Sequence, residues 1–205
     1  MTTVTNRRER KKIALRAQIL AIAIDLFARD GLDAVTIDQI AAAADIGKGT
    51  LYNYFSTKED IVVAFMADVE GRIAPKVARF APSSESLDGI LADYILLHFR
   101  LKRPYHAFVR VFLAQMFTDT ERFLPYMVEM QKFIDPPLER LFTTLRDRGI
   151  LRPGLDLPQL ILSFKTMHLG LTALWAIEGP PFRQTAQTVR RQMQFFAYGI
   201  ARKSK

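Results

Sequence analysis

The sequence predicts an all-α fold, and three observations support this prediction. Apolar residues recur at helical spacing along most of the 205 residues, and no stretch alternates apolar and polar residues as a strand would. The long helical segments are separated at prolines, which end or bend helices. A loop rich in Pro and Ser at residues 81–86 indicates a boundary between shorter N-terminal helices and longer C-terminal ones.

The composition excludes some kinds of site but does not identify the binding partner. Apolar residues make up 49% of the chain and charged residues 24%, as in a folded soluble protein. The net charge of +8 and the sequence pI of about 9.9 favour a polyanionic partner, either nucleic acid or an anionic membrane surface. The absence of cysteine excludes disulfides, thiolate zinc sites and cysteine nucleophiles, and it fits a reducing cytoplasm.

The N-terminal residues predict neither a signal peptide nor a membrane anchor. They carry charge but no following apolar segment, as a signal peptide would need. No uninterrupted apolar run approaches the roughly 18 residues that span a bilayer. We therefore expect a cytoplasmic protein with no membrane partner.

Residues 1–11 are predicted to form a disordered basic arm. The arm contains one acidic residue, Glu9, among the basic residues Arg7, Arg8, Arg10 and Lys11. Such a charge run is either a solvated tail or a segment that lies along phosphates or in a minor groove, and the sequence favours neither.

The first helix is predicted from Lys12 to Arg29, with Gly31 placed to cap its C-terminus. Its role is structural, because it would support the two helices that follow. The expected buried stripe consists of Ile13, Arg16 or Ala17, Leu20, Ile24 and Phe27.

The segment that begins at Thr36 predicts two short helices joined by a tight turn. Thr36 is a favourable N-cap, because its hydroxyl can accept a hydrogen bond from a backbone N–H of the first turn. Asp45 fits the end of the first helix, since Asp tolerates left-handed backbone geometry. The second helix, Gly47–Tyr54, would be held to the core by Leu51 and Phe55, which lie four residues apart.

The remaining side chains of this second helix are small, polar, cationic or hydroxyl-bearing. Groups of these kinds contact phosphates and base edges of DNA. Its two glycines cost about 1 kcal/mol each in helix propensity. A stability argument therefore does not explain them, whereas close approach of another backbone does. The arrangement predicts a helix-turn-helix whose second helix enters the DNA major groove.

Two alternatives exist for the same residues. One is a small helical hairpin with no role in DNA binding. The other is a phosphate loop at Gly47, Lys48 and Gly49, which we reject for three reasons. The segment lacks the third glycine of a dinucleotide fingerprint, the ending of a P-loop and a preceding strand.

The segment resembles the DNA-binding motif of the TetR (tetracycline repressor) family of bacterial transcriptional regulators. The resemblance covers about the first third of the chain, and core anchors and surface positions agree in one frame. Many members have Gly in the turn where this chain has Asp45, and Asp can adopt the same backbone. The matching residues are Phe27, Gly31, Thr36, Ile40, Ala41, Ala44, Ile46, Gly49, Thr50, Leu51, Tyr52, Tyr54, Phe55, Lys58 and Glu59.

The resemblance implies three parts after the arm. These are a helix-turn-helix domain at residues 12–56, a linking helix at 57–80 and a helical domain for ligand binding and dimerisation at 84–205. Thr36 and Lys58 would hold phosphates from helix N-terminal positions. The residues predicted to contact DNA are Thr36, Gly47, Lys48, Gly49, Thr50, Tyr52, Asn53 and Lys58.

From Leu87 onward the pattern is helical throughout. The expected helices are Leu87–Lys102, Pro104–Phe117, Glu121–Gly149, Leu157–Ile177 and Pro181–Arg202. The third of these contains Pro125, Pro136 and Pro137, so we expect it to be bent or divided into two helices.

Aromatic and Met side chains are spread over these C-terminal segments. They form either an ordinary core or the lining of a pocket between helices. Family members typically bind small ligands there, so the resemblance favours a pocket, and the Met content suits an apolar or amphipathic effector. The candidate ligand-binding residues are Phe112, Met116, Met127, Met130, Phe164, His168 and Trp175. The three histidines lack metal-ligand spacing, so neither a metal site nor a cofactor is expected.

The last two helices carry more apolar surface than one small core needs. Pairing them with the same helices of a second subunit would form a two-fold, four-helix interface, as the resemblance also implies. Burial within one chain is the alternative. The candidate interface residues are Leu160, Met167, Leu171, Leu174, Val189, Met193, Phe196 and Ile200.

The sequence therefore predicts a homodimeric, ligand-responsive transcriptional regulator, in this family most often a repressor, that binds a pseudo-palindromic operator. A small effector would shift the linking helix and release the DNA. We do not expect an enzyme, because the sequence shows no nucleophile elbow, metal constellation or phosphate loop. Two alternatives remain: a helix-turn-helix regulator controlled by a protein partner, and a basic helical protein that binds anionic membranes.

Overall fold

The computed structural model describes residues 7–201. This part of the chain contains no strand, and its isolated backbone bridge joins Leu151 to Ala201. The prediction of an all-α fold is confirmed. The helices are α1 (Arg7–Asp30), α2 (Ile37–Ala43), α3 (Lys48–Tyr52), α4 (Lys58–Val77), α5 (Leu87–Lys102), α6 (His106–Thr118), α7 (Thr120–Asp147), α8 (Leu157–Glu178) and α9 (Thr185–Ile200), with a 3-10 turn at Arg103–Tyr105.

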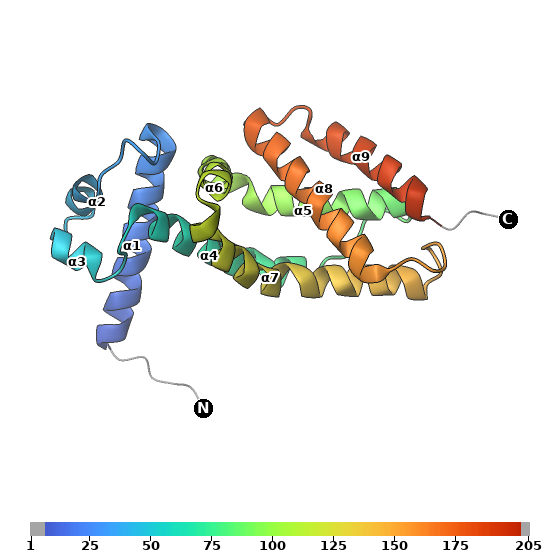
Figure 1. The fold of residues 1–205 in the computed structure, drawn as a ribbon, viewed down its shortest axis with the longest axis horizontal. Coiled ribbons are helices and arrows are strands. Elements are labelled where there is room, and N and C mark those ends of the chain that lie inside the picture. The colour runs from blue at the N-terminus through green and yellow to red at the C-terminus, as the bar shows by residue number, and fades with distance from the viewer. Residues whose placement is uncertain (1–6, 202–205) are drawn as a thin grey trace.

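Helix α4 lies between the two ends of the molecule and packs on both. Figure 1 shows α1, α2 and α3 at one end and α5, α8 and α9 at the other, with α4 extending between them. Helix α4 packs on α1 in the first group and on α5 and α7 in the second. One cluster of buried apolar residues includes Leu51 of α3, Val62 of α4 and Phe108 of α6. The two ends of the molecule are therefore packed on a shared helix.

Helix α1 begins at Arg7, so the predicted disordered arm is wrong for residues 7–11. Residues 1–6 lie outside the described part of the chain. Arg, Lys and Glu are good helix formers, which explains why the basic run continues the helix toward its N-terminus. Leu20, Ile24 and Phe27 are buried as expected, whereas Ile13 is exposed because this end of α1 extends beyond the core.

The corner between α2 and α3 depends on a single left-handed residue. Asp45 has φ of 54°, and its N–H donates to the Ala42 carbonyl at 3.1 Å, while the Ile46 N–H donates to the Ala41 carbonyl at 3.0 Å. This pair of bonds is a Schellman arrangement, which closes the end of a helix and redirects the chain. Asp45 therefore adopts the backbone that the sequence predicted for it.

Helix α7 runs unbroken through Pro125, Pro136 and Pro137. Of the two expected alternatives, a bent helix or two helices, the second is wrong. Phe123 and Phe142, on either side of the two central prolines, are fully buried. Packing on both halves of α7 therefore offsets the backbone hydrogen bonds that the prolines remove. Helix α5 has the predicted bounds, and α4 ends at Val77, soon after Pro75.

The left-handed backbone at position 45 makes a testable prediction. Asp45→Gly should leave the stability unchanged or raise it, because Gly adopts positive φ without strain. Asp45→Val should lower the free energy of unfolding by about 1–2 kcal/mol, because a β-branched residue is strained there. Urea unfolding of both variants checks this, and equal stabilities would contradict it.

Candidate functional site

Helix α3 divides into one buried anchor and an exposed surface. Leu51 is fully buried, and Phe55, one turn later, is buried beside it. Six residues predicted to contact DNA have exposed side chains or exposed glycine backbone, and they lie on this same short segment. They are Gly47, Lys48, Gly49, Thr50, Tyr52 and Asn53. The fold thus brings these six together on one accessible surface, which we call the α3 surface.

Gly49 is not required by the packing of the chain itself. A Cβ atom added at Gly49 would meet no other atom within 4 Å. Its φ is not positive, so the backbone does not need glycine either. The absence of a side chain at Gly49 therefore leaves room for another molecule to approach the α3 backbone closely.

Lys48 is paired with an acidic residue that sequence reasoning missed. Its Nζ lies 2.9 Å from Asp38 Oδ1 and 3.0 Å from Oδ2, across the α2–α3 corner. The hydrogen bond and the charge of Asp38 raise the pKa of Lys48, so the ammonium stays charged. Both side chains are exposed, so the pair can open at little cost when a phosphate competes for the ammonium.

Thr36 and Lys58 have roles within the protein. The Thr36 hydroxyl accepts the Gln39 N–H at 3.2 Å, and Gln39 Oε1 accepts the Thr36 N–H at 2.7 Å, forming a capping box. Lys58 Nζ donates to the Leu32 carbonyl at 2.7 Å and to the Asp33 carbonyl at 3.3 Å. This geometry gives Lys58 a structural role at the loop before α2, and its predicted phosphate contact stays a prediction.

The predicted ligand-binding residues fall into two separate groups. On α6 and α7, Phe112 packs on Tyr126 at a ring distance of 5.5 Å, and the Tyr126 hydroxyl donates to Met130 Sδ at 2.6 Å. Met116 is buried and Met127 partly buried on the same two helices. The second group is on α8, where Phe164, His168 and Trp175 each pack on an aromatic ring of α5. Phe164 also packs on Phe142 of α7, and Trp175 also packs on His106 of α6. The sequence could not show this division.

A group of polar side chains, all buried except for the partly buried His168, lies beside the second group. We call Glu70, Tyr94, His98, Lys102 and His168 the polar cluster. Glu70 of α4 and Lys102 of α5 form an ion pair at 2.5 Å, and both side chains are nearly inaccessible. The ring of His98 lies 4.8 Å from that of Tyr94 and 4.8 Å from that of His168. Burial is the main cause that lowers the pKa of both histidines, that of His168 to about 3.

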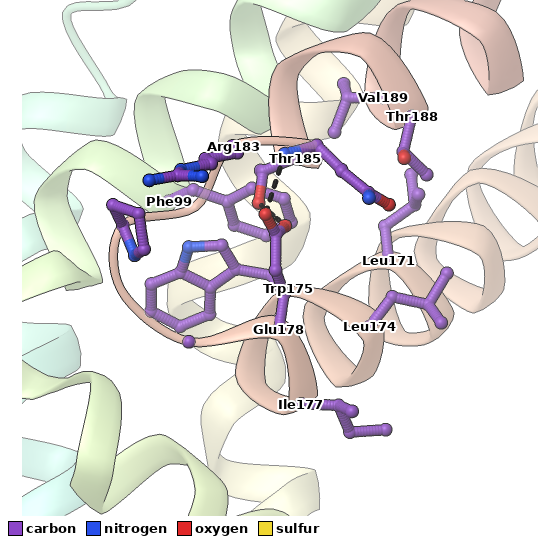
Figure 2. A pocket seen from close by; sticks show the side chains of 13 residues that line it. Phe99, Leu171, Leu174, Trp175, Ile177, Glu178, Arg183, Thr185, Thr188 and Val189 are labelled. Carbon is purple, nitrogen blue, oxygen red and sulfur yellow. Dashed lines mark hydrogen bonds between the residues drawn. The ribbon is translucent and has the colours of Figure 1, made fainter.

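A cavity of about 480 Å³ lies where α8 ends and α9 begins, and its lining includes Phe99, Leu171, Trp175 and Val189 (Figure 2). Of the predicted ligand-binding residues, Trp175 lines this cavity. Its ring stacks on Phe99 at 5.3 Å. Between these apolar side chains and Leu174, the Glu178 carboxylate accepts the Thr185 hydroxyl at 2.6 Å, which joins the end of α8 to the start of α9. The lining of the cavity therefore combines apolar and polar side chains.

The predicted dimer-interface residues are mostly part of the core of one chain. Leu160, Leu171, Val189, Met193 and Ile200 are buried within the chain, so the prediction is wrong for them. Met167 and Phe196 are partly buried, and Leu174 alone of the eight is exposed. The error has a simple cause: α8 and α9 each carry two apolar faces, and helical periodicity does not show which face turns inward.

The exposed apolar face of α8 and α9 consists of Leu174 and of residues outside the predicted set. Ile177 is 76% exposed, Phe195 76% and Tyr198 87%. Leu162, Leu169 and Ile177 of α8 recur about every two helical turns and so share one side of the helix. The exposed residues, which we call the α8–α9 face, are Leu162, Leu169, Leu174, Ile177, Phe195 and Tyr198. Among residues 7–201, no group of three or more His, Asp or Glu side chains could hold a metal ion.

Comparison with known proteins shows what the N-terminal part of the chain is similar to. A family model described as bacterial regulatory proteins of the tetR family matches residues 19–65. The HTH-type transcriptional repressor KstR2 of Rhodococcus jostii (strain RHA1) is 37% identical over 84 residues, which are 39% of this chain and 41% of the relative. The matched part thus spans less than half the length of that relative.

Two further similarities extend over most of the chain. KstR2 of Mycobacterium tuberculosis (strain H37Rv) is 28% identical over 183 residues, covering 86% of this chain and 88% of the relative. The structure of the transcriptional regulator FadR from Bacillus subtilis in complex with stearoyl-CoA has a TM-score of 0.72 at 20% identity. It covers 90% of this chain and 98% of the other. At that identity the likeness shows the fold.

The buried ion pair makes the second prediction. Lys102→Met should lower the free energy of unfolding by about 3 kcal/mol or more, because it leaves the Glu70 carboxylate buried without its counter-charge. The double variant Glu70→Leu with Lys102→Met should recover most of that loss. Arg72→Met is the control, since Arg72 pairs with Asp68 on the exposed side of α4 and should cost less than about 1 kcal/mol. Urea unfolding measures all three, and equal costs for the two single variants would contradict the prediction.

Proposed function

We propose that this chain, which belongs to the TetR family of bacterial regulatory proteins, is a transcriptional repressor that binds an operator through α3. The observation that carries the proposal is the α3 surface, where exposed Lys, Thr, Tyr and Asn side chains surround a glycine that the fold does not need. These groups suit contact with phosphates and base edges in a major groove. The family consists of transcription regulators. The α3 surface would bind DNA, and the protein would act in the cytoplasm.

The similar proteins support the repressor assignment and suggest a kind of effector. The two KstR2 relatives are named transcriptional repressors. The FadR structure contains stearoyl-CoA, a molecule with a long apolar chain. Together with the aromatic and Met content of the C-terminal half, these names favour a small apolar or amphipathic effector for this chain.

Two subunits would pair through the α8–α9 face. Among the described helices, α8 is the one that is long and apolar enough to cross a membrane by length and composition. Only 28% of its 18-residue apolar window is buried, so most of this apolar surface is not covered within the chain. A second copy of the same face would cover the rest, as two-fold interfaces are self-complementary. The resulting dimer would present two α3 helices to a pseudo-palindromic operator.

Effector binding would act on DNA affinity through α4. This helix packs both on α1 and on α5 and α7, so a change of packing in the C-terminal half reaches the DNA-binding end. The effector must bind the DNA-incompetent arrangement more tightly, or it shifts nothing. The spacing of the two α3 helices is the property that this shift would alter.

Gly49→Ala tests the proposed role of the α3 surface. Replacing the glycine should raise the melting temperature through better helix propensity. It should weaken binding to DNA from the upstream region of the protein's own gene by about tenfold or more, because a methyl group then blocks the close approach. Fluorescence anisotropy at two salt concentrations measures the affinity.

Gly71→Ala is the matched control for this experiment. Gly71 lies in α4, and an added Cβ there also meets open space, so this variant should be stabilised without loss of DNA affinity. Tyr52→Ala should weaken operator binding and leave binding to random DNA nearly unchanged. Operator binding that survives both Gly49→Ala and Tyr52→Ala would overturn the proposal.

Ile177→Glu tests the proposed interface. A carboxylate at this exposed apolar position should split the dimer into monomers, because pairing would bury two charges without partners. Sedimentation velocity measures the oligomeric state. Val128→Glu is the control, since Val128 is also apolar and exposed but lies on α7. A dimer that persists in Ile177→Glu, or that is lost in both variants, would argue against the α8–α9 face.

A further inference from the structure

The α3 surface carries one charged side chain, and that side chain is already engaged. Of its six residues only Lys48 is charged. Its Nζ lies 2.9 Å from Asp38 Oδ1 and 3.0 Å from Asp38 Oδ2. Asp38 lies in the first turn of α2, so the ion pair spans the corner between the two helices. The surface that would bind DNA therefore has a carboxylate beside its cation.

The stability of the corner does not explain this ion pair. The side chains of Lys48 and Asp38 are 52% and 66% exposed, and exposed ion pairs contribute little to stability. The corner is already closed by the backbone bonds at Asp45 and Ile46 and by the buried Leu51. An acidic residue in the first turn of α2 is favourable to the helix dipole, but that effect needs no contact with Lys48. The contact between the two side chains is therefore not required by the fold.

A carboxylate at this position opposes contact with phosphates. Phosphate contacts supply nearly all of the affinity of a protein for random DNA, and they depend on cationic side chains. The pair of Lys48 and Asp38 has no net charge. A phosphate that contacts Lys48 must displace the Asp38 carboxylate, and the two anions then lie close together and repel each other. Asp38 therefore makes Lys48 a poor phosphate contact.

The paired ammonium can still donate to a base. A lysine ammonium has three N–H groups, so one remains when each carboxylate oxygen of Asp38 accepts one of the others. Lysine side chains contact guanine at O6 and N7 in the major groove, and the N-terminal residues of a recognition helix contact base edges. Lys48 is the first residue of α3. Its position and its remaining donor therefore suit contact with a guanine.

We propose that Asp38 is a positioning residue that determines specificity: it holds Lys48 for contact with a guanine of the operator and suppresses contact with phosphates. This inference rests on the proposed function, because it assigns a role within the same DNA-binding surface. On the operator the ion pair stays closed and the guanine accepts the remaining N–H. On random DNA a guanine at the matching position is the exception, and Asp38 competes with phosphates for the ammonium. Asp38 thus lowers the affinity for random DNA without lowering the affinity for the operator.

Asp38→Asn tests the effect on phosphates. A neutral amide holds the ammonium more weakly than a carboxylate does, so Lys48 becomes free to contact a phosphate. The affinity for a random duplex should rise by about tenfold, and the plot of log affinity against log salt should become steeper by about one unit, as for one more phosphate contact. Fluorescence anisotropy over a series of salt concentrations measures both. A salt slope equal to that of the native chain would overturn the proposal, whatever the stability of the variant.

Asp33→Asn is the matched control. Asp33 is exposed in the loop before α2, five residues before Asp38, and it is not the partner of Lys48. Its replacement removes the same charge, so a general effect of net charge appears in both variants. Asp33→Asn should leave the salt slope unchanged, and Asp38→Glu, which keeps the carboxylate, should stay close to the native slope. An equal steepening in Asp33→Asn and Asp38→Asn would show an effect of net charge alone and would contradict the proposal.

Lys48→Met tests the contact with a guanine. Each G·C pair of the operator is replaced in turn by A·T, because adenine presents an N6 donor where guanine presents the O6 acceptor. At one pair of each half-site the native chain should lose about tenfold in affinity, while Lys48→Met should lose nothing and Asp38→Asn less than about threefold. If every replacement affects the native chain and Lys48→Met equally, Lys48 does not contact a guanine and the inference is wrong.

The inference and the proposed function give different results in these measurements. If the native chain binds the operator no more tightly than random DNA, the proposed function is wrong, and the role of Asp38 is wrong with it. If the native chain prefers the operator but Asp38→Asn behaves as Asp33→Asn does, the operator assignment stands and only the role of Asp38 is wrong.

Discussion

The packing of the C-terminal half depends on the ion pair between Glu70 and Lys102. It ties α4 to α5 deep in an apolar interior, where two charges are tolerated only together. A pair of apolar residues of similar volume would fill that space at no loss of stability. What the pair adds is a definite register between two helices, one of which continues to the DNA-binding end.

The local features of the N-terminal part could be predicted because they depend on neighbours in the sequence. The Thr36 cap, the left-handed backbone of Asp45 and the burial of Leu51 each follow from a few adjacent residues. The role of Lys58 could not, because the carbonyls it binds lie 25 and 26 residues earlier in the chain. The same limit hides the polar cluster, whose members come from α4, α5 and α8. Only the fold shows that these separate polar residues meet.

Helices α8 and α9 show a different limit of sequence reasoning. Both are apolar on more than one side, and the pattern identifies the stripes without indicating which is internal. In the fold, Val189 and Met193 face α5, while Phe195 and Tyr198 point away from the core. The residues expected at an interface are those that hold one chain together, and the residues free to form an interface are their neighbours along the helix. Both sets are needed if one pair of helices is to serve a core and a contact between subunits.

The early start of α1 has a consequence for how the protein meets DNA. Residues 7–12 bear five cationic side chains on a continuous helix rather than on a flexible strand. A helix with side chains is about 10–12 Å across, whereas the minor groove of B-DNA is about 6 Å wide, so this segment cannot thread into it while folded. In the proposed complex with DNA, its charges would act at a distance, drawing the protein toward any phosphate backbone and speeding encounter in a salt-dependent way. Under this proposal, the rate of search and the choice of sequence would depend on different helices of the same small domain, α1 and α3.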